Sequence, residues 1–361
     1  MRRELPMGAS PIVSGSSGAQ RADAAIIADR LRSTLGDGQS LLDQALAPIQ
    51  GDLQRVAERI LSELTDLIAR RVVYLITAGG KRLRPALVLL AGAIGAAPNR
   101  NALIDTAAAV ELIHTATLIH DDIIDQSTLR RSQPTFHDRW GTEQAVLMGD
   151  YLYATAFTVL SRIDRPFVVR TIADVCRQLC RGELREVDAR YRLDLTEAEY
   201  LEIIRDKTAS LTAGCCRCGA SLGGASDDIV ERFATFGTNF GLAFQIVDDC
   251  LDLVGEVKEL GKSIHADLDK GALSLPIIYL SETLSASQRE QLFAPLRTQA
   301  TDPVFLARIA QAAQECGAIV RAQQRAGRFL QIAHEALAGI PLNGLAAAYD
   351  LLVQYTVSRR S

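Results

Sequence analysis

ELIHTATLIHDDIID (residues 111–125) closes a long run in which apolar residues recur at every third or fourth position. That spacing is typical of a helix with a buried face. The same period runs through 53–76, 107–124, 145–163, 167–187, 200–222 and 229–254, whereas alternating strand patterns are almost absent. The sequence therefore predicts an all-α fold, built as a single large helical bundle.

Local signals mark the helix starts and the domain boundary. Thr196 with Glu199, and Ser285 with Gln288, have the spacing of a capping box. Residues 1–20 are rich in Gly, Ser and Pro and carry no apolar period, which predicts a disordered N-terminal tail. We expect residues 21–361 to form one folded domain.

The composition is that of a globular protein without a strong charge. The 361 residues include 39 Lys and Arg against 43 Asp and Glu, a net charge of −4, which argues against nucleic-acid binding. The N-terminus lacks an apolar signal core, and no uninterrupted apolar stretch approaches the roughly 18 residues of a membrane span. Seven cysteines in this context are expected to be reduced thiols. We expect a cytoplasmic protein without stable membrane insertion.

Two aspartate clusters stand at the ends of the helical runs 107–124 and 229–254. Each reads D-D-x-x-D, and the candidate metal-ligating residues are Asp121, Asp122, Asp125, Asp248, Asp249 and Asp252. Carboxylates four residues apart share a helix face and repel, and the negative end of the helix dipole adds to the repulsion. Mg²⁺, which binds carboxylate and phosphate oxygens, would compensate this charge. A solvated acidic helix end is the alternative, but apolar residues precede both clusters.

Basic residues are placed to meet an anion. GGKRLRP (79–85) precedes an apolar helix, where free backbone N–H groups together with Lys and Arg favour phosphate, although a basic surface loop is the alternative. Arg130 and Arg131 follow the first aspartate cluster, Lys207 lies in an apolar helical context, and Lys262 follows the second cluster. These separate groups predict a cavity for a polyanion held through Mg²⁺, and they indicate two such anions.

The motifs occur in one order along the chain: GGKRLRP (79–85), ELIHTATLIHDDIID (111–125), LRR (129–131), GDYL (149–152), RGE (181–183), KTASL (207–211), FQIVDDCLD (244–252), LGK (260–262) and the stretch 267–276. From about residue 50 onward, this series resembles the trans-isoprenyl diphosphate synthases, the head-to-tail prenyltransferases. The resemblance implies the isoprenoid synthase fold with a central cavity, a homodimer, and two or three Mg²⁺ ions per active site. It also implies condensation of isopentenyl diphosphate with an allylic diphosphate.

The resemblance assigns roles by motif position. As Mg²⁺ ligands it implies Asp121, Asp125 and Asp248, with Asp122, Asp249 and Asp252 as supporting carboxylates. For the allylic diphosphate it implies Arg130, Lys207 and Lys262, and for isopentenyl diphosphate Lys81, Arg84, His114 and Arg131. Thr208 and Gln245 flank the reacting carbons and, with Lys207 and Lys262, complete the expected catalytic set.

Several positions depart from the family pattern. Ser132 stands where Gly is usual, Ser263 where Pro is usual, and His265 where Gly is common. Ala272 replaces a usual Lys, while Lys270 lies two residues earlier. We hypothesise that Lys270 supplies the missing basic contact.

Small residues stand where the family uses bulk to stop chain growth. Ala116 and Thr117 lie five and four residues before the first Asp of the first cluster, and a bulky aromatic there would block the product. Ile113 and Leu112 are candidates for a tunnel floor further along the helix. We therefore predict a long product, hexaprenyl to decaprenyl, as for a quinone side chain. A geranylgeranyl or farnesyl product is the alternative.

Two other classes of protein share part of this motif pattern. A terpene cyclase would carry a different second metal motif, and a regulatory subunit of a heteromeric prenyltransferase commonly loses an aspartate motif, whereas both are intact here. Cys215, Cys216 and Cys218 are predicted to be small core residues rather than metal ligands. For Arg359 and Arg360 the sequence leaves open closure over a diphosphate or disorder.

Overall fold

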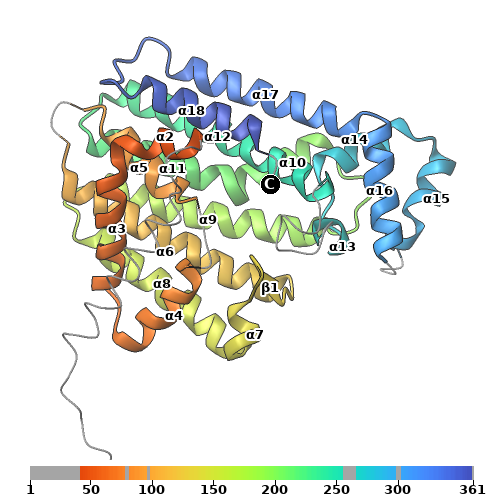
Figure 1. The fold of residues 1–361 in the computed structure, drawn as a ribbon, viewed down its shortest axis with the longest axis horizontal. Helices are drawn as coiled ribbons and strands as arrows, with labels where there is room; N and C mark the ends of the chain where they lie inside the picture. The colour runs from red at the N-terminus through yellow and green to blue at the C-terminus, as the bar shows by residue number, and fades with distance from the viewer. Residues whose placement is uncertain (1–40, 78–80, 96–97, 255–265, 298–301, 360–361) are drawn as a thin grey trace, which may run out of the picture.

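The structure is a computed structural model that describes residues 41–77, 81–95, 98–254, 266–297 and 302–359. In chain order its elements are α2 (Leu41–Leu46), the 3₁₀ helix η1 (Ala47–Ile49), α3 (Gln50–Ser62), α4 (Asp66–Thr77), α5 (Leu83–Gly92), α6 (Arg100–Ile124), β1 (Leu129–Arg130), β2 (Gln133–Pro134), α7 (Phe136–Trp140), α8 (Thr142–Ser161), α9 (Pro166–Ala189), α10 (Glu197–Ile204), the π-helix η2 (Arg205–Ala209), α11 (Ser210–Leu222), α12 (Asp227–Val254), α13 (Ala266–Asp269), α14 (Leu275–Thr283), α15 (Ala286–Arg297), α16 (Pro303–Glu315), α17 (Ala318–Ala336) and α18 (Ala346–Ser358). The predicted all-α fold is confirmed (Figure 1). The predicted tail, residues 1–20, lies outside the described residues.

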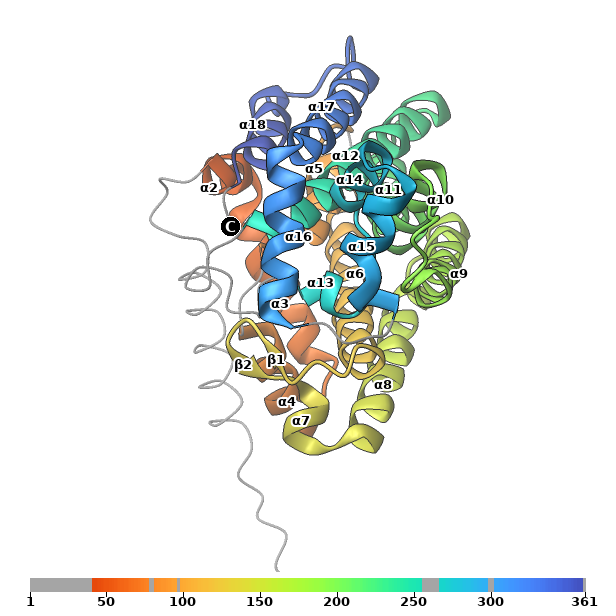
Figure 2. The same cartoon turned by 90° about the vertical axis from the view of Figure 1, so that its right-hand side faces the viewer.

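Helices α6 and α12 form the inner part of the bundle. α6 packs against α3, α5, α8 and α11, whereas α12 packs against α11, α17 and α18. Helices α13 to α16 lie together at one end of the molecule, which faces the viewer in Figure 2. Because α6 and α12 each end in an aspartate cluster, this packing fixes where the carboxylates stand.

Small residues let the inner helices approach closely. Ala107, Ala108 and Ala109 on α6 are fully buried, and so is Gly237 on α12. A side-chain carbon at Gly237 would come within 2.5 Å of the Thr212 carbonyl oxygen on α11, so only glycine permits this contact. The close helix packing explains why these runs are rich in Ala and Gly.

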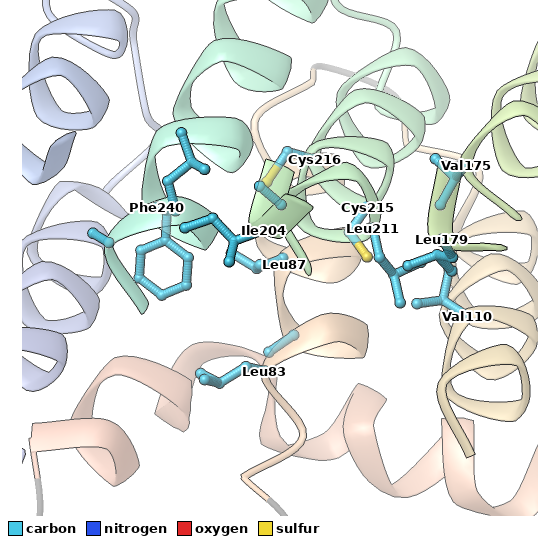
Figure 3. Close-up of a cluster of buried hydrophobic side chains, with 14 of the residues drawn as sticks. Leu83, Leu87, Val110, Val175, Leu179, Ile204, Leu211, Cys215, Cys216 and Phe240 are labelled. Carbon is cyan, nitrogen blue, oxygen red and sulfur yellow. The ribbon is translucent and has the colours of Figure 1, made fainter. Parts of the chain in front are cut away.

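Apolar side chains from most of the helices meet in one core. Figure 3 shows Leu87 of α5, Val110 of α6 and the sulfur-bearing residues Cys215 and Cys216 of α11 among them. Cys215, Cys216 and Cys218 are fully buried, which confirms their predicted role as core residues. Burial also raises the pKa of Cys216 and Cys218, so these thiols stay protonated at neutral pH.

Three local features differ from the sequence prediction. The helix expected over 53–76 is two helices, because the chain turns at residues 63–65 between α3 and α4. The helix expected over 200–222 is interrupted by the π-helix η2. A two-strand hairpin was also missed, in which Leu129 pairs with Pro134 and Arg130 with Gln133.

One helix among the described residues, α6, is long and apolar enough to cross a membrane, although the sequence analysis had identified no such segment. In the structure, 78% of its apolar window is buried inside the protein. Burial of this kind is typical of the core helix of a globular bundle.

Candidate active site

The first aspartate cluster ends α6 and is held by basic residues from other elements. Asp122 is buried and accepts a paired hydrogen bond from the Arg130 guanidinium, at 2.9 and 3.0 Å from Nε to its two oxygens. Asp125 accepts hydrogen bonds from Arg190 Nη2 at 2.6 Å and from Lys270 Nζ at 3.1 Å. The hairpin β1–β2 thus folds Arg130 back onto the cluster that precedes it.

Asp121 faces acidic and basic groups of α9 and η2. Burial raises the pKa of Asp121 to about 7, and nearby Glu183 and Asp125 add to this shift, whereas Lys207 and Arg130 oppose it. Glu183 Oε1 is buried and accepts no hydrogen bond within the described residues. A buried carboxyl group with other carboxylates close by favours a bound cation.

Lys207 projects from the π-helix η2 into this acidic region. Its Nζ lies 2.8 Å from Glu183 Oε2 and 2.8 Å from Glu186 Oε1. Burial lowers the pKa of Lys207, but Glu186 and Glu183 outweigh burial and raise it above its usual value. Lys207 is therefore charged at neutral pH.

Helix α9 and η2 interlock around Lys207. Asp206 is buried and accepts hydrogen bonds from Arg181 Nε at 2.6 Å and Arg181 Nη2 at 2.7 Å, with Arg185 Nη1 at 3.1 Å. A side-chain carbon at Gly182 would lie 2.4 Å from the Lys207 backbone nitrogen. π-Helical segments are frequent at functional sites, and this one fixes the direction of Lys207.

The next residue along η2 begins a polar chain that ends in the second aspartate cluster. Thr208 Oγ1 donates to Gln245 Oε1 at 2.8 Å, and Gln245 Nε2 donates to Asp249 Oδ1 at 2.8 Å. Tyr200 OH donates to Asp249 Oδ2 at 2.5 Å. Burial, with Asp267 nearby, raises the pKa of Asp249 well above its usual value. Thr208 and Gln245, predicted together, are in direct contact.

The other carboxylates of the second cluster are more accessible. Asp248 forms an ion pair with Arg359, and Asp252 Oδ2 accepts a hydrogen bond from the Asp267 backbone N–H at 3.4 Å. Asp249 points instead into the buried chain with Tyr200. Asp248 is therefore the carboxylate of this cluster best placed to meet a ligand.

A group of cations lies at the start of α5 and the middle of α6. Arg84 Nη1 lies 3.1 Å from His114 Nε2. Burial and the positive charges of Arg84, Arg130 and Arg131 lower the pKa of His114 well below its usual value, so His114 is neutral. Arg84 Nε is buried and has no hydrogen-bond partner among the described residues. Three of the residues predicted for isopentenyl diphosphate, Arg84, His114 and Arg131, are thus brought together.

Lys81, the fourth residue of that predicted set, lies at the start of the same helix. Burial, together with the positive charge of Arg359, lowers the pKa of Lys81 to about 8. Arg82 forms an ion pair with buried Glu111, so it serves to hold the α5 start against α6. The excess of cations over carboxylates at this place favours an anionic ligand.

Residues 267–270 contact both aspartate clusters: the Asp267 backbone N–H donates to Asp252 Oδ2 at 3.4 Å, and Lys270 Nζ donates to Asp125 Oδ2 at 3.1 Å. Burial lowers the pKa of Arg84, whereas Asp248 and Asp121 act in the opposite direction. Within the described ranges no three His, Cys, Asp or Glu side chains gather closely enough to bind a metal by themselves. Mg²⁺ commonly takes only one or two carboxylates and completes its shell with phosphate oxygens and water. The unpartnered Glu183 oxygen beside Asp121 and the ionic character of these ligands fit such an ion.

The predicted chain-length residues lie along one stretch of α6. Leu112, Ile113 and Ala116 are fully buried, and Thr117 is partly buried. Tyr153 of α8 stacks on His120, which lies closer to the aspartate cluster than this stretch does, with 6.2 Å between ring centroids. The central cavity and tunnel stay predictions.

Some residues of the site were not predicted from the sequence, and some predicted residues lie outside the described ranges. Glu183 appeared only within the motif RGE, and Glu186 was not singled out. Their role depends on the ion pairs with Lys207 of η2, a segment distant in the sequence. Lys270 donates to Asp125 and Ser127, and its role as the replacement for the usual Lys at position 272 stays a prediction. The predicted catalytic residue Lys262, with Ser263 and His265, lies outside the described residues.

Comparisons with known proteins place this arrangement in a family. Residues 65–312 match the family model described as polyprenyl synthetase. The chain is 36% identical to heptaprenyl diphosphate synthase component 2 of Geobacillus stearothermophilus, over 84% of this chain and 92% of that protein. It is 35% identical to a geranylgeranyl diphosphate synthase of Saccharolobus solfataricus, over 80% and 89%.

A solved structure is similar in fold. The polyprenyl synthase of Caulobacter crescentus CB15, complexed with calcium and isoprenyl diphosphate, superposes with a TM-score of 0.85 and 33% identity. The match covers 89% of this chain and 98% of that one. The chain therefore belongs to the polyprenyl synthetase family and is a prenyltransferase of the trans-isoprenyl diphosphate synthase type.

Proposed function

We propose that the protein joins isopentenyl diphosphate to an allylic diphosphate in a Mg²⁺-dependent reaction and repeats the step to a long all-trans polyprenyl diphosphate. The observation that carries this proposal is that residues 267–270 contact both aspartate clusters, through Asp252 Oδ2 at 3.4 Å and Asp125 Oδ2 at 3.1 Å. In this proposal, Asp121, Asp125 and Asp248 hold two or three Mg²⁺ ions around the allylic diphosphate.

The chain's own residues prepare the leaving group. An allylic diphosphate ionises only where its developing charge is neutralised, and bound Mg²⁺ would supply most of that neutralisation. Lys207, which Glu183 and Glu186 hold in place, adds a positive charge beside Asp121. Arg130 already donates hydrogen bonds to Asp122, so in this proposal its guanidinium binds the diphosphate and also holds Asp122 of the first cluster in place.

The second substrate is proposed to lie at the start of α5. Arg84, His114, Arg131 and Lys81 would hold the diphosphate of isopentenyl diphosphate, and neutral His114 can donate or accept a hydrogen bond there. This orients the double bond toward the allylic carbon. Positioning of two reactants in this way supplies much of the rate in such condensations.

The reacting carbons are proposed to lie near Thr208 and Gln245. The Thr208 hydroxyl donates to Gln245, which leaves hydroxyl lone pairs to face the allylic cation. Asp249 and Tyr200 fix the Gln245 amide from behind. Loss of a proton from the new carbon chain to the departed diphosphate then completes the step, and no residue is assigned as a dedicated base.

A long product is supported by the side chains of α6. Ala116 and Thr117 are small, and no Phe, Tyr or Trp of α6 lies between Ile113 and Asp121. We propose a hexaprenyl to decaprenyl product, as used for quinone side chains. Relatives named as geranylgeranyl synthases match as well, so a shorter product is the alternative.

The proposal also covers the oligomeric state and the cellular location of the protein. We propose a homodimer in the cytoplasm, which rests on the sequence. The relative named as component 2 favours one alternative, namely that this chain works with a different partner subunit.

Two carboxamide variants test the metal assignment. Asp121→Asn and Asp248→Asn should each lower kcat/KM for isopentenyl and farnesyl diphosphate about 10²- to 10³-fold, the range seen when one charge-stabilising group is lost. Asp174→Asn, at an exposed position of α9, is the matched control and should retain activity. Full activity of both cluster variants would contradict the proposal.

A further inference from the structure

Arg359, directly after α18, lies on the second aspartate cluster. Its Nη2 forms an ion pair with Asp248 Oδ1. Its guanidinium also lies over the ring of Phe244, 4.3 Å from the centroid, one turn before Asp248 on α12. Figure 1 shows α18 running to the middle of the molecule, and α18 packs against α12. Arg359 therefore covers a carboxylate that the proposed function assigns to Mg²⁺.

The contact is buried but incompletely satisfied. The Arg359 side chain is only 8% exposed, whereas Asp248 is 36% exposed. Arg359 Nε and Nη1 are buried and have no hydrogen-bond partner among the described residues. Leaving donors of a buried charge unpaired costs free energy, so the guanidinium depends on its single carboxylate partner and its aromatic neighbours.

Neighbouring groups hold Arg359 there and also oppose it. α18 packs against α2 and α12, and Tyr355 lies one turn before Arg359, 6.0 Å from its guanidinium. Lys81 lies over the same Tyr355 ring at 5.2 Å, so two cations share one aromatic side chain. Mutual repulsion of these cations weakens the hold on Arg359.

We propose that Arg359 is an intramolecular counter-ion for Asp248 that competes with the divalent metal ion, so that metal binding at the second cluster requires release of Arg359. The inference rests on the proposed function, because it takes Asp248 as a metal ligand. One carboxylate oxygen cannot hold a guanidinium and a metal ion in the same direction. The contact balances the charge of Asp248 while the metal is absent and lowers the metal affinity of the substrate-free protein.

Metal binding to the protein alone tests this competition. Mn²⁺ binding is followed by electron paramagnetic resonance for the wild type, Arg359→Gln and Arg359→Lys, each with and without inorganic pyrophosphate. Without pyrophosphate, Arg359→Gln should bind Mn²⁺ about tenfold more tightly than the wild type, which corresponds to about 1.4 kcal/mol. Arg359→Lys, which keeps the charge, should lie between them. Arg177→Gln, which removes an exposed arginine of α9, should match the wild type.

A second readout uses the wild type and does not depend on a variant folding. Hydrogen exchange of the backbone amides at residues 355–358 should accelerate at least several-fold when Mn²⁺ is added, because the last turn of α18 loses its anchor. Unchanged exchange together with equal Mn²⁺ affinity of wild type and Arg359→Gln would overturn the inference while leaving the proposed function intact. Absence of Mn²⁺ binding in every variant, even with pyrophosphate, would overturn both.

Discussion

Substitution of Gly182 by alanine tests the interlock that aims Lys207. A side-chain carbon at Gly182 would lie 2.4 Å from the backbone nitrogen of Lys207 and 2.8 Å from its Cα. Ordinary contact begins at 3.4 Å, so α9 and η2 must separate by about 1 Å. Both contacts are with backbone atoms, which cannot turn aside as a side chain can.

Two magnitudes follow from that displacement. Forcing an extra carbon into a close-packed contact costs about 1 to 3 kcal/mol of unfolding free energy. Lys207 moves with η2 while Glu183 and Glu186 move with α9, so its 2.8 Å contacts lengthen. A misplacement of this size costs about 10²-fold in rate where catalysis depends on position.

The assay combines denaturant unfolding with steady-state kinetics on isopentenyl and farnesyl diphosphate. Gly327→Ala is the matched control, because Gly327 lies within α17 and nothing lies within 4 Å of an added carbon there. That control should gain about 0.4 to 1 kcal/mol and keep its activity. If Gly182→Ala retains both stability and kcat/KM, the interlock does not position Lys207 and the reasoning is wrong.

Four further predictions concern other parts of the site. Ala116→Tyr should shorten the main product, as measured by mass spectrometry, because its ring would fill the space beside α6; an unchanged length would remove Ala116 from the proposed wall. Lys270→Ala should raise KM for the allylic diphosphate several-fold with little change in kcat, since Lys270 donates to Asp125, and unaltered kinetics would refute its compensating role. Ser132→Gly should raise the unfolding free energy by about 0.5 to 1 kcal/mol. The backbone φ of Ser132 is 60°, a conformation that costs a non-glycine residue about 1 to 2 kcal/mol. The greater conformational entropy of glycine in the unfolded chain offsets part of that gain. Asp121 has a native pKa of about 7 against about 3.9 when unfolded, so the native state holds the extra proton and stability falls as pH rises from about 4 to 7. Thermal unfolding in EDTA should therefore show a Tm that falls less between pH 5 and pH 8 for Asp121→Asn than for the wild type, and equal slopes would count against this assignment.

The helical period predicted much of the fold because it is a local property. Helices α8, α9 and α12 begin and end within a few residues of the predicted runs. The period could not show the break between α3 and α4, since apolar residues continue through it. The π-helix η2 was equally hidden, because the groups that stabilise Asp206 lie on α9.

In the candidate site, too, local sequence features could be predicted, whereas contacts between distant segments could not. The aspartate clusters and the basic motif at 79–85 could be found from residue types and spacing alone. The contacts of Lys207 with Glu183 and Glu186, and of Arg359 with Asp248, join segments distant in the sequence. Such contacts depend on how the helices pack, which spacing within one helix does not determine.

The turnover of defined substrates is the most direct test of the proposed Mg²⁺-dependent synthesis of a long polyprenyl diphosphate. Purified protein is incubated with isopentenyl diphosphate, Mg²⁺ and, in separate reactions, dimethylallyl, geranyl, farnesyl or geranylgeranyl diphosphate, and the products are sized by mass spectrometry. We expect chains of six to ten isoprene units with at least one primer, and no product when EDTA removes the metal. Absence of product with every primer in the presence of Mg²⁺ would contradict it and favour a subunit that needs a partner.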